Sequence, residues 1–237
     1  PNSCTRSKSA LPGRSLARRP VPRPDHRVFD RCGRKIQTVG GKMKRWNKVT
    51  SKWEPYQPGS RTYPSPSASL KAQIDQIQAT SDGTMRYWPA QVTLHNGTTH
   101  PCVYFADASE YIKVWGVWPD DDSGKNEIEM EDIAAISASP SRLPLKFAEQ
   151  LYRAGESGMG YTAFELLYSD GSKSAHLAGN AIDFVGLPRG KQSIDMVHVL
   201  PHAGRDSKNH IKTPDYAWCL FSTPPRNPSF LASLFRK

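Results

Sequence analysis

Two segments in the second half of the chain carry residue types suited to anion binding and proton transfer. One is the glycine-rich stretch 155–160, and the other is the stretch 198–210. Imidazole exchanges a proton near neutral pH, and a guanidinium binds oxyanions, so the two stretches could line a small-ligand or hydrolase-type site. Such a site requires the fold to bring the two stretches together. The candidate pocket residues are Glu156, Ser157, His198, His202 and Arg205.

Neither stretch contains a complete catalytic motif. Residues 155–160 follow a predicted helix and precede a predicted strand, which is the reverse of a phosphate-binding loop. Met159 stands where a nucleophile elbow requires glycine. His198 and His202 are four residues apart, but Pro201 lies between them and a strand precedes them, so they do not share a helical face. A flexible connection and a surface turn are therefore the structural alternatives.

Metal and redox chemistry find little support in the sequence. Aligning the acidic run 120–122 with a calcium loop puts Pro119 at the first ligand position and Met130 at the last, and neither side chain can ligate calcium. No CxxC pair occurs, and Cys102 and Cys219 lie in apolar runs typical of core residues. The sequence predicts no metal, no cofactor and no catalytic residue, and it favours a non-enzymatic protein without excluding an enzyme.

The positive charge of the chain is concentrated at its beginning. The 237 residues carry a net charge of +10, and residues 1–42 hold eleven Lys and Arg against two Asp, a net charge of +9. Residues 43–237 carry +1. Because large apolar residues are few and prolines are frequent in this part of the chain, we expect residues 1–69 to form a disordered basic arm.

A basic arm with interspersed aromatic residues suits nucleic acid. Arginine binds phosphates with two hydrogen bonds, and tryptophan stacks on bases. The sequence therefore predicts binding of RNA or another polyanion. The expected nucleic-acid-binding residues are Arg6, Arg14, Arg18, Arg19, Arg23, Arg27, Arg31, Arg34, Lys35, Lys42, Lys44, Arg45, Trp46, Lys48 and Trp53.

Two other interpretations of the arm remain open. Residues 1–24 contain arginine and serine but no acidic residue, as organellar targeting segments do, although their prolines do not suit an amphipathic helix. Alternatively, residues 1–42 do not belong to the native protein, which then starts at Met43 and is an uncharacterised soluble domain. We expect a cytoplasmic location, with a mitochondrial location as the alternative.

We call residues 70–223 the body of the protein. The body is predicted to be α+β and rich in β-structure, with two small antiparallel sheet or barrel-like units that each follow a short helix. The first unit covers 70–140 and contains the Asn96-Gly97 hairpin turn. The second covers 141–223, and residues 224–237 form a tail. The halves share an order of elements that a duplication would explain. The expected helices are 69–80 and 143–154, and the expected strands are 87–94, 102–106, 111–118, 127–131, 161–168, 173–178, 181–185, 194–199 and 216–221.

Together these patterns predict a non-enzymatic RNA-binding or assembly protein, such as an accessory subunit of a ribonucleoprotein. The dense aromatic residues between 87 and 118 form either the core of a small sheet or a platform that stacks on bases. No run of about 18 apolar residues occurs, so no membrane partner is expected. The alternative function is a small-ligand-binding or hydrolase-type domain that uses the candidate pocket.

Overall fold

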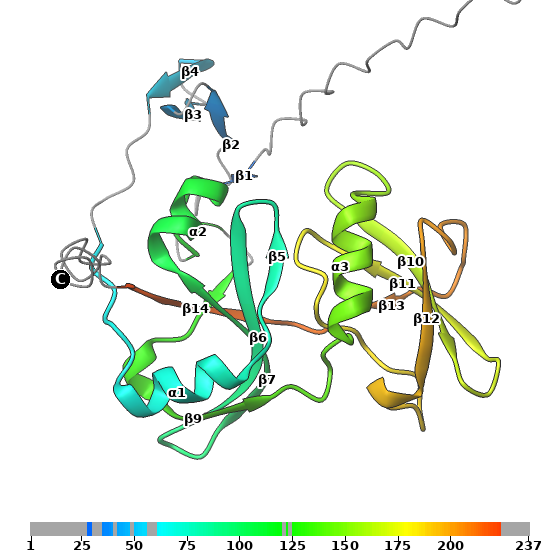
Figure 1. Cartoon of the computed structure of the whole chain (residues 1–237). Helices are drawn as coiled ribbons and strands as arrows, with labels where there is room; N and C mark the ends of the chain where they lie inside the picture. The colour runs from blue at the N-terminus through cyan, green and yellow to red at the C-terminus, as the bar shows by residue number, and fades with distance from the viewer. Residues whose placement is uncertain are drawn as a thin grey trace, which may run out of the picture.

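The computed structural model describes residues 28–29, 35–39, 42–47, 50–55, 61–119, 122 and 125–223, with side chains from residue 50 onward. Their architecture is α+β and rich in β-structure, as predicted. Two larger sheets carry the three helices α1–α3 (Figure 1). The sheets are mixed rather than purely antiparallel, and neither closes into a barrel.

The first sheet has the strand order β5-β6-β7-β14-β8, and β9 also pairs with β6. The strand β14 runs parallel to both of its neighbours and is buried along its whole length. A central parallel strand reads as a continuous apolar run, which explains the sequence of this strand. The strands are β5 (Thr80–Asp82), β6 (Met85–Leu94), β7 (Thr99–Asp107), β8 (Asn126–Glu127), β9 (Ile133–Ala138) and β14 (Ala217–Phe221).

The second sheet has the order β12-β10-β11-β13, in which β13 is parallel to β11 and the other pairs are antiparallel. The expected second unit included the strand at 216–221, but that strand is β14, which crosses back into the first sheet (Figure 1). The two units are therefore interleaved along the chain. The strands are β10 (Thr162–Tyr168), β11 (Lys173–Ala178), β12 (Met196–Pro201) and β13 (Ile211–Lys212).

The helices begin and end at residues with clear local causes. In α1 (Ala68–Gln76), the Ser67 hydroxyl accepts the N–H of Leu70 (3.2 Å). The helix α3 (Leu145–Ala154) follows Pro144, ends at Gly155 with a φ of +80°, and buries an apolar face on the second sheet. Both helices lie where the apolar periodicity predicted them, although α1 ends before the predicted residue 80 and α3 begins after the predicted residue 143.

The strand expected at 111–118 is wrong, because residues Ala108–Trp115 form the helix α2. The Asp107 carboxylate accepts the N–H groups of Ser109 (2.9 Å) and Glu110 (3.2 Å), which begins the helix. Gly116 adopts a φ of +75° and ends it. This capping outweighs the β-propensity of the aromatic and β-branched residues between the caps.

Two other expected strands differ. Of the strand expected at 127–131, only Glu127 pairs, as part of β8 (Asn126–Glu127). The 3-10 helix η2 (Met130–Asp132) follows. The stretch 181–185 is buried but makes only one β-bridge, between Phe184 and Arg142. Apart from Asp183, its residues are apolar because they fill the junction between the two sheets rather than because they extend one.

Part of the expected 1–69 arm has regular structure. A separate four-stranded antiparallel sheet contains β1 (Val28–Phe29), β2 (Lys35–Val39), β3 (Lys42–Asn47) and β4 (Lys52–Pro55). Further along, Tyr63 is buried and its ring packs against Trp118, with 5.3 Å between centroids. The body thus begins before residue 70, because Tyr63 completes an apolar cluster that α2 leaves open. The tail 224–237 lies outside the described residues.

The β6–β7 and β10–β11 hairpins turn through the same kind of three-residue loop. The N–H of Leu94 donates to the Thr98 carbonyl, and the N–H of Gly97 donates to the Leu94 carbonyl. Tyr168, Gly171 and Ser172 repeat this pattern. Only the glycine has positive φ, so the Asn96-Gly97 hairpin is confirmed but its turn is not the two-residue type. The likeness is local, and a duplication of the units stays a prediction.

Three apolar clusters hold the body together. An aromatic cluster lies between the first sheet and α2, an aliphatic cluster lies on the opposite face of that sheet with α1, and a third lies under α3. Cys102 and Cys219 are buried and unpaired, which confirms them as core residues. The aromatic residues between 87 and 118 are largely core, since Tyr87, Tyr104 and Tyr111 are fully buried. None of the described helices is long and apolar enough to cross a membrane.

Candidate functional site

The structure brings together part of the candidate pocket predicted from the sequence. Ser157 Oγ lies 2.8 Å from His202 Nδ1, and Arg205 Nε donates to the Tyr161 hydroxyl (3.1 Å). The loop 155–160 and the turn after β12 are thus in contact, as the small-ligand alternative requires. Glu156 accepts the N–H of Gly160 within its own loop. His198 lies apart from these residues, exposed on β12 opposite Leu167.

The hydrogen bonds at Ser157 have the character of a structural clamp. Its hydroxyl accepts the N–H of Ala163 (2.9 Å) and lies 3.2 Å from the Ala163 carbonyl oxygen, to which it can donate. If His202 Nδ1 carries the proton, it donates to the remaining lone pair, and every bonding position of the hydroxyl is used. A serine in this state has no free proton to give to a base. The loop is therefore tied to β10 rather than presented as a nucleophile.

The predicted nucleic-acid-binding residues fall into two groups. Lys35, Lys42, Lys44, Arg45 and Trp46 lie in β2 and β3, and Trp53 lies in β4. The structure places the first five by their backbone only. The others lie outside the described residues: Arg6, Arg14, Arg18, Arg19, Arg23, Arg27, Arg31, Arg34 and Lys48.

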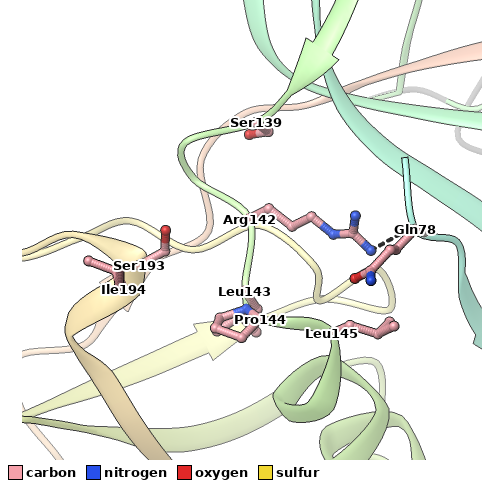
Figure 2. A pocket seen from close by; sticks show the side chains of 8 residues that line it. All are labelled: Gln78, Ser139, Arg142, Leu143, Pro144, Leu145, Ser193 and Ile194. Atoms are coloured by element: carbon pink, nitrogen blue, oxygen red, sulfur yellow. Dashed lines mark hydrogen bonds between the residues drawn. The ribbon is translucent and has the colours of Figure 1, made fainter. Parts of the chain in front are cut away.

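A cavity of about 290 Å³ lies at the junction between the two sheets, and we call it the junction pocket. Figure 2 shows Arg142 extending across it toward Gln78, with Ser193 and Ile194 on the other side. The linker between β9 and α3 supplies half of the lining residues. The lining residues are Gln78, Ser139, Arg142, Leu143, Pro144, Leu145, Ser193 and Ile194.

Arg142 is the charged residue of this pocket. Its Nη2 donates to the Gln78 carbonyl oxygen (2.5 Å) and to Thr80 Oγ1 (3.3 Å). Its Nε is buried and has no hydrogen-bond partner among the described residues. Burial lowers the pKa of the guanidinium, while the nearby Asp183 carboxylate acts in the opposite direction. The side chain is half-buried, and its two hydrogen bonds fix it at the cavity wall.

Asp183 anchors the junction behind the pocket. This fully buried carboxylate accepts hydrogen bonds from Thr80 Oγ1 (2.5 Å) and the Tyr152 hydroxyl (2.7 Å), and its own N–H donates to the Tyr104 hydroxyl (3.0 Å). Burial raises the pKa of Asp183, although these hydrogen bonds and Arg142 oppose the rise. The carboxylate joins β5 to α3 and the backbone N–H adds β7, so the role of Asp183 is to fix the two sheets against each other.

Comparison with protein-family models, with curated proteins and with solved structures found no match. Among the described residues, no group of three or more His, Cys, Asp or Glu side chains is placed to hold a metal ion. The functional argument therefore depends on the residues of this chain alone.

Sequence reasoning missed Arg142 as a candidate. Its only signal is a position between Pro140 and Pro144 in the linker that separates the predicted units. An arginine in a short linker between two folded units lies near both of them, so it is a reasonable candidate for a residue at the junction. Its partners Gln78 and Thr80 are more than 60 residues away in sequence, and no local pattern connects them.

Proposed function

We propose that the protein is a non-enzymatic binding protein that holds RNA or another polyanion with its basic leading segment. The body of two sheets carries this segment and docks on a protein assembly, as an accessory subunit of a ribonucleoprotein does. The observation that carries the proposal is the division of charge, with +9 in residues 1–42 and +1 in residues 43–237. A concentrated positive charge binds polyanions by releasing their counterions. The expected cytoplasmic location and the mitochondrial alternative stay predictions.

The register of the N-terminal sheet supports this proposal. Alternate positions of a strand share one face, and directly paired positions lie on the same face. Positions 42, 44 and 46 of β3 therefore share a face with positions 53 and 55 of β4 and positions 37 and 39 of β2. Position 35 belongs to this face by alternation. In the sequence, the face carries Lys35, Lys42, Lys44, Trp46 and Trp53.

Such a combination of residues suits single-stranded nucleic acid. Lysine residues follow the phosphates of a single strand, while aromatic rings stack on the bases without regard to their identity. The pairing of Trp46 with Trp53 puts two aromatic positions side by side. The opposite face carries a mixed set that includes Met43, Arg45 and Glu54.

Matched double variants of the full chain test which face binds. Lys42→Gln with Lys44→Gln removes two positive charges from the lysine and tryptophan face, and Arg45→Gln with Lys52→Gln removes two from the other. Fluorescence anisotropy with a labelled single-stranded RNA oligomer measures the affinity. We expect the first pair to weaken binding by roughly tenfold and the second by clearly less, since the first pair removes phosphate contacts on the face that also carries the tryptophans.

Thermal unfolding of both variants controls for their folding. Equal losses of affinity contradict the assignment of binding to this face. Unchanged affinity in both variants, or no binding by the unmodified chain at 50 mM salt, contradicts polyanion binding by this sheet.

A further inference from the structure

The junction pocket has the charge expected of an anion site. Arg142 is half-buried at its wall, yet no carboxylate of the described residues lies within 4.0 Å of its guanidinium nitrogens. Both protein acceptors of this guanidinium, the Gln78 carbonyl and the Thr80 hydroxyl, are uncharged. Charged groups removed from water are ordinarily paired, because the lost hydration is otherwise uncompensated. The nearby Asp183 carboxylate is separated from the guanidinium by Thr80 Oγ1, which bonds both side chains. The guanidinium thus has no directly bonded anion, and the pocket favours a ligand that supplies one.

The N-terminal end of α3 adds a second positive electrostatic potential at the pocket. Pro144 and Leu145 line the cavity at the beginning of α3, and no described side chain caps this end of the helix. The first N–H groups of a helix have no partner within it and carry partial positive charge. An anion in the cavity is thus attracted by the guanidinium and by the beginning of α3, which belong to the same short stretch of chain.

The rest of the wall is mixed, with the polar residues Gln78, Ser139 and Ser193 and four apolar residues. Leu143, Pro144 and Leu145 form one side, and Ile194 stands at the mouth with 85% of its surface exposed. A large aliphatic side chain exposed to this extent beside a cavity gains by covering a ligand. A water molecule occupies about 30 Å³, so the cavity of about 290 Å³ has room for a ligand of roughly ten non-hydrogen atoms.

We infer that the junction pocket binds a small organic anion, a carboxylate or a phosphate ester with a short apolar part. Arg142 holds the oxyanion, and the aliphatic side chains contact the carbon chain. Carboxylate and phosphate each present two neighbouring oxygens that accept two hydrogen bonds from one guanidinium. The site is separate from the N-terminal sheet, so the inference stands or falls independently of RNA binding.

Chemical-shift titration of the ¹⁵N-labelled full chain tests this site, with butyrate, inorganic phosphate and the neutral amide butyramide as probes. We expect butyrate or phosphate to shift the amide signals of residues 142, 143, 145, 146, 193 and 194 with a saturating curve in the millimolar range or below. A stronger response to butyrate identifies the carboxylate source, and a stronger response to phosphate identifies the phosphate source. Butyramide should leave these signals nearly unchanged.

Two matched glutamate substitutions, one at the mouth of the pocket and one away from it, test where the anions bind. Ile194→Glu places a negative charge beside the cavity without disturbing the core, and we expect it to weaken the binding of the anions by roughly three- to tenfold. Val197→Glu makes the same change at another exposed aliphatic residue, on β12, and should leave the affinity unchanged.

Three results would overturn the inference. They are the absence of saturable shifts with both anions, equal binding of butyramide and butyrate, and equal effects of the two glutamate substitutions. An Arg142→Lys variant that unfolds at the same temperature as the unmodified chain and binds butyrate equally well would also remove Arg142 from the site.

Discussion

At the scale of single residues, Ser157 and Arg142 differ in how their bonding capacity is used. Ser157 Oγ has three hydrogen-bond partners, all within the protein. Arg142 has two neutral acceptors and a buried Nε without a partner among the described residues. A polar group without a partner costs free energy unless a ligand or water satisfies it. Arg142 is therefore the better ligand-binding candidate, although Ser157 has the more familiar neighbour.

In the second sheet, His176 is another buried polar side chain whose chemistry depends on its surroundings. It is 2% exposed, its Nε2 lies 2.6 Å from Ser174 Oγ, and its ring stacks on Phe164 with 5.2 Å between centroids. Burial, with a smaller effect of His210, lowers the pKa of His176 from 6.5 to about 4. The folded protein thus keeps this imidazole neutral at pH values where an unfolded chain would protonate it.

We predict that this histidine makes stability depend on pH. Because its folded pKa is depressed, the unfolded state takes up the proton first, and stability falls as the pH drops from about 6.5 toward 4. The free energy of unfolding should fall by about 2 kcal/mol between pH 7 and pH 5 from this group. Urea unfolding at both pH values measures it in the unmodified chain, in His176→Gln and in His198→Gln, which alters an exposed histidine. The prediction fails if His176→Gln retains the full decline.

Whether the role of a residue could be predicted depends on how far away its partners lie along the chain. The hydrogen bond between Ser157 and His202 brings the 155–160 loop into contact with the turn after β12, but a ligand site at this contact stays a prediction. The separation of His198 from this group also agrees with the expectation that Pro201 divides the two histidines. Arg142 and Asp183 were missed, because their partners come from elements that no local pattern links to them.

At the scale of elements, the aromatic cluster between α2 and the first sheet leaves several polar atoms without partners. Tyr87 Oη, Tyr111 Oη, Trp115 Nε1 and Trp218 Nε1 are buried and have no hydrogen bond among the described residues. The cluster is therefore held by ring packing, such as that of Tyr111 on Trp218 with 5.0 Å between centroids. Tyr104 is the exception, because its hydroxyl accepts the N–H of Asp183.

Two neighbouring tyrosines on paired strands test this difference. Tyr87 and Tyr104 are both fully buried, with 5.7 Å between their centroids. We predict that Tyr104→Phe lowers the free energy of unfolding by about 1–3 kcal/mol, since it leaves a buried N–H without an acceptor. Tyr87→Phe should change it by less than about 0.5 kcal/mol. Chemical denaturation of both variants measures the contrast, and equal destabilisation would contradict the assigned hydrogen bonds.

Elements with strong local patterns were predicted well, and those decided by caps or distant pairing were not. The helices α1 and α3 and the hairpins at Gly97 and Gly171 follow from periodicity and turn residues. The helix α2 was taken for a strand, because its cap at Asp107 is a single residue within an aromatic run. The position of β14 depends on a parallel pairing more than 100 residues away along the chain, which no local rule specifies.

At the scale of the whole molecule, the net positive charge and the two larger sheets lie in separate parts of the chain. The leading segment carries nearly all of the net charge, and the interleaved sheets are fixed by β14 and by the buried Asp183. The α+β class was predicted correctly, but the mixed sheets and the N-terminal sheet were not. Both depend on long-range pairing rather than on local sequence. A rigid junction suits a body that positions a binding segment.

The dependence of RNA affinity on salt tests the central claim most directly. If about five cations of the leading segment contact phosphates, the logarithm of the association constant should fall against the logarithm of the salt concentration with a slope of roughly −3.5 for a single strand. Anisotropy titrations of the full chain between 50 and 200 mM salt give this slope. A slope of −3 or steeper is the predicted result, and a slope near zero, or no measurable binding at the lowest salt, would contradict the proposal.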